Sequence, residues 1–294
     1  MSKKEDRLGS LLGQFTSASA VPEGDAYFHN KLKEGLHGIA FSPYEEGQKP
    51  GDHISEVQIR RRMSIIQPYV KWIRSFSCTE GNELIPQIAH EMGVKTMVGA
   101  WIGDDKEKND LEIDALIRSA KAGHVDIAAV GNEVMYREEL EEAELIEYIK
   151  RVKRELPNIP VGYVDAYYEF ENRPAIVDSC DLVLTNCYPY WEGCHLDYSL
   201  LYMKSMYQRA LKAARGKKVI ITETGWPNEG ETFHGAVPSK AGAIQYFLNA
   251  QEWSNTEGIE LFYFSSFDEA WKTGAEGDVG AFWGLWDKDE QLKF

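Results

Sequence analysis

Two glutamates stand near the carboxyl ends of apolar runs that have the character of buried strands. Glu133 lies in IAAVGNEV (127–134), and Glu223 lies in VIITETGWP (219–227). Hydrolysis of a glycosidic bond needs two carboxyl groups that face one cavity. One is protonated and donates its proton to the leaving oxygen, while the other is ionised and attacks the anomeric carbon or activates a water. The pair therefore predicts carbohydrate chemistry if the fold brings the two strand ends together.

Further polar and aromatic residues follow similar apolar runs. Aromatic rings suit the apolar faces of sugars, while acids and amides hold sugar hydroxyls. The candidates for substrate binding or for support of the site are Tyr44, Arg74, Trp101, Asn132, Asp165, Tyr188, Tyr190, Trp191, Trp226, Glu269, Trp271 and Lys272.

Each candidate also has a plainer explanation. Strand ends are polar because they face water, which accounts for a lone acid but not for two glutamates after apolar runs. Arg74 could form an ion pair at the bottom of a barrel, and Asp165 could bind a sugar hydroxyl or cap the next segment. Of the tryptophans, which could simply pack, we expect two or three to touch sugar, Trp191 and Trp271 first. The five concerned are Trp101, Trp191, Trp226, Trp271 and Trp283.

The elements that must position these residues follow from the apolar pattern. Short strand-like runs alternate with segments of helical length, and the weakest helical segment is ENRPAIVDS, which is short and contains a proline. Eight such units predict an α/β fold, a single (β/α)₈ TIM barrel with short loops over residues 35–294. Residues 1–34 are expected to form a tail or a leading helix. The predicted strands span residues 35–42, 69–77, 95–102, 126–134, 160–167, 181–190, 218–226 and 260–269.

This fold predicts where the chemistry lies. Active sites of such barrels use the carboxyl ends of the strands, and the fourth and seventh strands face each other across the barrel mouth. Glu133 and Glu223 would therefore converge in one cavity.

Composition limits the partners. The chain has 294 residues, of which 43% are hydrophobic and 27% charged, and its net charge is −15. An acidic surface repels phosphate backbones, so we expect no nucleic acid partner and a neutral substrate. No run approaches about 18 apolar residues, so no membrane span is expected. Separately, we expect a monomer. The first residues lack the apolar core of a signal peptide, so the expected location is cytoplasmic, or extracellular or periplasmic if an export signal was removed.

Neither a metal nor a cofactor is predicted. The seven histidines show no HExxH or paired spacing, and the four cysteines form no CxxC pair. Cys187 and Cys194 could close a small loop if oxidised, although free thiols are favoured. A metal-assisted barrel enzyme would need acids on three successive strands, and the third predicted strand ends in Trp101 instead.

Eight motifs together resemble glycoside hydrolase family 17, in particular its compact bacterial members. They occur in the family's order and extend over about residues 35–294, which is nearly the whole chain. The motifs are FSPY (41–44), IRSFS (73–77), VGAWIGDD (98–105), VGNEV (130–134), CYPYWEG (187–193), TETGWP (222–227), SFDEAWK (266–272) and GAFWGLWD (280–287).

The resemblance implies a (β/α)₈ barrel that cleaves or transfers β-1,3-glucan with retention of configuration. Glu133 would be the general acid/base and Glu223 the nucleophile, about 5–5.5 Å apart. Asn132 would bond the sugar 2-hydroxyl, and Tyr188 and Arg74 would hold Glu223. The family's polar cluster after the eighth strand corresponds to Glu269, Lys272 and Glu276.

The sequence leaves the fate of the glycosyl-enzyme open. Hydrolysis of a laminarin-type glucan, with endo cleavage favoured, is the first expectation, and a β-1,3-glucanosyltransferase with the same two glutamates is the alternative. A remote alternative is a non-catalytic glucan-binding barrel. Loss of a glutamate would mark such a protein, and both glutamates are present.

Overall fold

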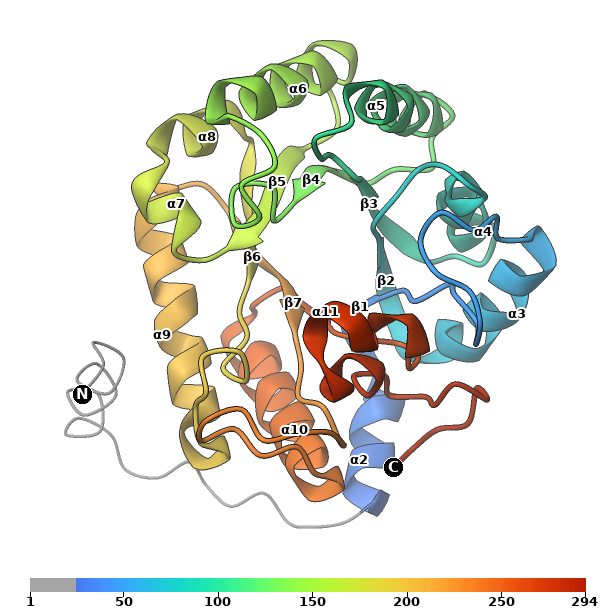
Figure 1. Ribbon diagram of the computed structural model, residues 1–294, viewed down its shortest axis with the longest axis vertical. Coiled ribbons are helices and arrows are strands. Elements are labelled where there is room, and N and C mark those ends of the chain that lie inside the picture. Colours follow the sequence, from blue (N-terminus) through green and yellow to red (C-terminus); the bar gives the residue numbers. More distant parts are fainter. Residues whose placement is uncertain (1–24) are drawn as a thin grey trace.

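A closed barrel of eight parallel strands forms the centre of the molecule. The computed structural model describes residues 25–294, and its strands pair in chain order, with β1 closing on β8. Figure 1 looks into this barrel, with the long helices arranged around it. The strands are β1 (Leu36–Ala40), β2 (Val70–Ser75), β3 (Lys95–Ala100), β4 (Ile127–Asn132), β5 (Val161–Ala166), β6 (Leu182–Asn186), β7 (Val219–Thr224) and β8 (Leu261–Tyr263).

The predicted (β/α)₈ architecture is therefore confirmed, with strands shorter than expected at their carboxyl ends. The residues beyond each strand leave the sheet and form the loops of the barrel mouth. For example, β6 ends at Asn186, so Tyr188 stands on a loop. β8 is the shortest strand, and the polar SFDEAWK segment follows it as loop and 3₁₀ helix.

Helices cover the outside of the barrel, and local signals set where several begin. The N-cap residues of α3, α5 and α10 are Ser55, Asp105 and Ser239, respectively. Their side chains accept hydrogen bonds from backbone N–H groups of the first turn. A capping box starts α6, whose acidic first turn and basic last turn suit the helix dipole. The helices are α2 (Asp25–Glu34), α3 (Glu56–Ile66), α4 (Ile85–Glu91), α5 (Lys106–Lys121), α6 (Glu142–Glu155), α7 (Glu169–Asn172), α8 (Pro174–Ser179), α9 (Leu196–Ala214), α10 (Lys240–Glu257) and α11 (Thr273–Glu276).

The weak helical segment after the fifth strand is resolved into two short helices. Arg173 separates α7 from α8, and Pro174 starts α8, because proline lacks the N–H that a helix interior needs but is tolerated in a first turn.

Two apolar clusters hold the barrel together. A large one lies between sheet and helices, and a small one includes Met97 from β3, Leu184 from β6, Ile220 from β7 and Phe262 from β8. The ring of Phe262 lies against Gly38 and occupies the space that a side chain there would need. A Cβ at residue 38 would lie only 2.5 Å from the ring.

The chain ends of the described region meet beside α10. The ring of Phe28, on α2, lies 4.8 Å from that of Phe247 on α10 and 5.3 Å from that of Phe294. The rest of the expected tail or leading helix, residues 1–24, lies outside the described residues. Within residues 25–294, no helix combines the length and apolar character that a membrane crossing requires.

Candidate active site

The end of β4 turns so that two consecutive side chains reach the barrel mouth. Gly131 has φ +83° and Glu133 has φ +52°, and the pairing with β5 shifts register between Ala129 and Asn132. In a regular strand, consecutive side chains point to opposite faces. The irregularity therefore allows both Asn132 and Glu133 to line the same cavity.

Glu223, near the end of β7, is held from two sides. The Arg74 guanidinium forms an ion pair with its Oε1, and the Tyr188 hydroxyl donates to its Oε2 over 2.7 Å. Arg74 also donates to Asn132 Oδ1 over 2.7 Å, which joins the ends of β2, β4 and β7. Burial, followed by the charge of Glu223, raises the pKa of Tyr188 well above its usual value, so the phenol remains a donor.

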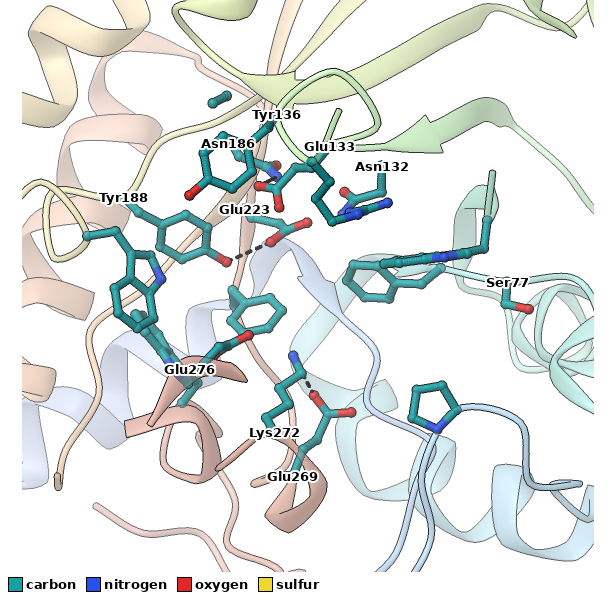
Figure 2. A pocket seen from close by; sticks show the side chains of 18 of the residues that line it. Ser77, Asn132, Glu133, Tyr136, Asn186, Tyr188, Glu223, Glu269, Lys272 and Glu276 are labelled. Atoms are coloured by element: carbon teal, nitrogen blue, oxygen red, sulfur yellow. Dashed lines mark hydrogen bonds and ion pairs between the residues drawn. The ribbon is translucent and has the colours of Figure 1, made fainter. Parts of the chain in front are cut away.

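Glu133 has a different environment. Its Oε1 accepts a 2.8 Å hydrogen bond from the Asn186 amide. Burial and then the negative charge of Glu223 raise the pKa of Glu133 to about 7, although the bond from Asn186 opposes the rise. Figure 2 shows the two carboxyl groups in the same part of the cavity, Glu133 beside Asn186 and Glu223 beside Tyr188. The carboxyl group of Glu133 can therefore hold a proton near neutral pH, while the neighbouring carboxylate of Glu223 is paired with Arg74.

A polar cluster follows β8 on another side of the cavity. Lys272 Nζ lies 2.9 Å from Glu269 Oε2, and Trp271 Nε1 donates to Glu269 Oε1 over 3.2 Å. Burial opposes the charge of Lys272, but the charges of Glu269 and Glu276 raise its pKa on balance. Burial raises the pKa of Glu276 despite the nearby ammonium. Lys272 therefore places a positive charge among the acids of this wall (Figure 2).

The cavity has a volume of about 830 Å³ and aromatic walls. The Arg137 guanidinium covers the Trp101 ring at 4.6 Å, the rings of Tyr44 and Trp271 lie 6.0 Å apart, and Trp191 packs on Trp283 at 5.7 Å. Apolar faces with a few convergent polar groups are suited to a neutral sugar chain. Among residues 25–294, no group of three or more His, Cys, Asp or Glu is arranged to hold a metal ion.

Comparison with known proteins shows the family of the chain. The family model described as the BtgE/BtgC glycoside hydrolase domain matches residues 38–284. The chain belongs to this glycoside hydrolase family. The resemblance to glycoside hydrolase family 17 drawn from the eight motifs is confirmed.

Relatives are found among fungal enzymes. A glucan 1,3-beta-glucosidase of Candida albicans is 27% identical over 258 residues, covering 79% of this chain and 83% of its own. One from Arthroderma benhamiae is 29% identical over 249 residues, covering 76% and 78%. The crystal structure of the family 17 beta-1,3-glucanosyltransferase from Rhizomucor miehei matches with TM-score 0.80 and 29% identity, covering 89% of this chain and 96% of its own.

Most residues predicted for the site of this glycoside hydrolase are brought together. The ion pair of Arg74 with Glu223 lies at the carboxyl ends of the strands, so Arg74 does not form an ion pair at the bottom of the barrel. The predicted residues that line the cavity are Tyr44, Trp101, Asn132, Glu133, Tyr188, Trp191, Glu223, Glu269, Trp271, Lys272 and Glu276, and Trp283 lines it too.

Three predicted residues, Asp165, Tyr190 and Trp226, do not line the cavity, which favours the supporting or packing roles that the sequence also allowed for them. Asp165 is fully buried and accepts bonds from the Tyr163 hydroxyl and, over 3.3 Å, from the Tyr136 N–H, so it holds the turn after β4. Tyr190 donates to Glu231 O over 2.9 Å and Trp226 to Val237 O over 3.1 Å. Both therefore anchor the loop after β7.

Several cavity residues were not predicted. Asn186, the last residue of β6, directly precedes the CYPYWEG motif, and its position at a strand end was an available signal. Tyr136 and Arg137 come from the turn after Glu133, and Phe233 comes from the loop after β7. No hydrophobic periodicity or sequence motif marks Phe233 as a site residue. Its ring reaches the cavity only because the folded loop places it 5.9 Å from the ring of Trp191.

The four cysteines are buried free thiols, including Cys187 and Cys194. Burial raises the pKa of both thiols to about 12, so they remain protonated and unreactive.

Proposed function

We propose that this protein cleaves β-1,3-glucan by a retaining double displacement, with Glu223 as nucleophile and Glu133 as general acid/base. The observation that carries the proposal is the contrast between the two carboxyl groups. Glu223 is paired with Arg74, and Glu133 has a pKa of about 7. The names of the fungal relatives support the substrate, since they are glucan 1,3-beta-glucosidases and a beta-1,3-glucanosyltransferase.

The first step divides the work between the two glutamates. The Glu223 carboxylate attacks the anomeric carbon, Glu133 protonates the glycosidic oxygen, and the leaving chain departs with that proton. The Arg74 and Tyr188 donors orient the attacking carboxylate. Asn132, which Arg74 holds by its amide oxygen, can donate its NH₂ to the sugar hydroxyl beside the anomeric carbon.

The second step reverses the role of Glu133. Esterification removes the charge of Glu223, which is one of the causes of the raised pKa of Glu133. Its pKa then falls, and the ionised Glu133 takes a proton from the acceptor, which attacks the glycosyl ester. A water acceptor gives hydrolysis, and a glucan hydroxyl gives transfer.

Transfer is the second candidate function, and the match to the Rhizomucor miehei glucanosyltransferase supports it. A product time course with laminari-oligosaccharides, resolved by mass at low and high substrate concentration, separates the two. Only shorter products at both concentrations mean hydrolysis, and longer products that increase with concentration mean transfer.

The retaining mechanism has its own test. Proton NMR during the first minutes of laminaripentaose cleavage should show the β-anomer of the new reducing end before mutarotation. Early formation of the α-anomer would contradict double displacement and the proposed carboxyl separation of about 5–5.5 Å. Glu223→Gln should abolish turnover while glucan binding, measured by calorimetry, persists.

A further inference from the structure

Asn186 joins the candidate acid/base to the strand that carries the candidate nucleophile. Its Nδ2 donates to Glu133 Oε1 over 2.8 Å, and its Oδ1 accepts a 2.8 Å bond from the Thr222 hydroxyl. Asn186 and Thr222 are buried, with exposed fractions of 3% and 0%. Because the hydroxyl bonds the amide oxygen, the amide nitrogen is turned towards Glu133.

An irregularity between β6 and β7 creates this arrangement. Their register runs from Thr185 opposite Ile221 to Asn186 opposite Glu223, so Thr222 is an extra residue on β7. Such a bulge changes the direction in which side chains point. Consequently the Thr222 hydroxyl reaches Asn186 while the neighbouring Glu223 carboxylate reaches Arg74 and Tyr188.

We propose that Asn186, oriented by Thr222, is a positioning residue that makes Oε2 of Glu133 the oxygen that gives and takes the catalytic proton. The inference rests on the proposed role of Glu133 as general acid/base. Among residues 25–294, the bond from Asn186 is the one hydrogen bond to the Glu133 carboxyl group.

The chemistry follows from the donor character of the amide. An N–H group can only donate, and the carbonyl oxygen of a protonated carboxyl group is a better acceptor than its hydroxyl oxygen, so Oε1 is favoured as the carbonyl oxygen and Oε2 as the oxygen that carries the hydrogen. In the first step this proton moves from Oε2 to the glycosidic oxygen as its bond to the anomeric carbon breaks and the bond from Glu223 to that carbon forms. The resulting Glu133 carboxylate keeps the Asn186 bond, and Oε2 takes the proton of the acceptor in the second step.

The same bond stabilises the ionised form of Glu133. The Asn186 amide counteracts burial and the charge of Glu223, and so keeps the pKa of Glu133 from rising further. Without it, the acid would hold its proton more strongly and would be a poor base in the second step.

The test uses Asn186→Ala, Thr222→Val and Thr222→Ser, each in the full chain. The pH profile of kcat/KM on laminaripentaose is measured from pH 5 to pH 9. Loss of one hydrogen bond to a charged group should move the basic limb of Asn186→Ala up by about one pH unit. We expect kcat to fall about tenfold with KM little changed, because the group acts on proton transfer and not on substrate binding.

Thr222→Val keeps the test decisive if Asn186→Ala does not fold. Its basic limb should move in the same direction by a smaller amount, since the amide loses the bond that orients it, and Thr222→Ser should restore the wild-type profile. Thr185→Val is the matched control. It removes a buried hydroxyl from the residue before Asn186 and should leave the profile unchanged.

Two outcomes separate this inference from the proposed function. If Thr222→Val, and Asn186→Ala where it folds, keep the wild-type basic limb while Glu133→Gln is inactive on laminaripentaose, Asn186 does not position the acid and the inference is overturned. If Glu133→Gln retains wild-type activity, the proposed role of Glu133 is itself wrong.

Discussion

Neutralising Glu223 should lower the pKa of Glu133, and the structure gives the size of the effect. The pKa of Glu133 is about 7 against an ordinary value of 4.5, with burial as the larger cause and the charge of Glu223 as the second. Glu223→Gln should therefore remove part of this difference, and about one pH unit is expected for the loss of one nearby charge. Loss of the Glu223 charge also leaves Arg74 unpaired, which acts in the same direction.

The magnitude agrees with simple electrostatics. One pH unit corresponds to about 1.4 kcal/mol. Two unit charges about 5 Å apart interact by that amount when the effective dielectric constant is about 50, a value between protein interior and water. Such a constant fits a cavity that opens to solvent and holds charged walls.

The assay is a titration of ¹³C-labelled glutamate side chains by NMR, in wild-type protein and in Glu223→Gln. The Glu133 signal is assigned by its absence in Glu133→Gln, and its midpoint should fall from about 7 to about 6. Glu80→Gln makes the same chemical change at another residue of the cavity wall and should leave the midpoint unchanged. An unchanged midpoint in Glu223→Gln would refute the reasoning, because burial alone would then raise the pKa and esterification could not turn the acid into a base.

Three further results are expected. Glu133→Gln should lose far more activity on laminaripentaose than on an aryl β-glucoside with a good leaving group, because only the poor leaving group needs the proton; equal losses on both would disprove its role as acid. Tyr188→Phe removes the 2.7 Å bond to Glu223 and should lower kcat/KM roughly 10- to 100-fold in steady-state kinetics, and a loss below twofold would show that Arg74 alone suffices. Gly131→Ala should lower the free energy of unfolding by about 1–3 kcal/mol in urea titrations, since Gly131 has φ +83° and a Cβ there would lie 2.9 Å from a neighbouring side chain. Gly123→Ala, at φ +87° with nothing within 4 Å of the added Cβ, is its control and should cost less.

The sequence determined the architecture and the two central residues because these depend on local pattern. Each apolar run forms its strand from its own composition, and eight such runs alternating with helices close into a barrel. All carboxyl ends of a parallel barrel lie at one mouth, so a glutamate at the end of a run is placed at that mouth without knowledge of any other contact, although the direction of its side chain is not yet set. Glu133 and Glu223 were found in this way.

Tertiary structure alone decided which neighbours act on these glutamates. The bond from Asn186 to Glu133 depends on the bulge at Thr222, and the bridge from Arg74 to both Glu223 and Asn132 depends on the register of distant strands. A shift of one residue turns a side chain from the cavity to the opposite face, and no local pattern in the sequence specifies that shift. For the same reason Asp165, which also stands at a strand end, faces the buried turn after β4 instead of the cavity.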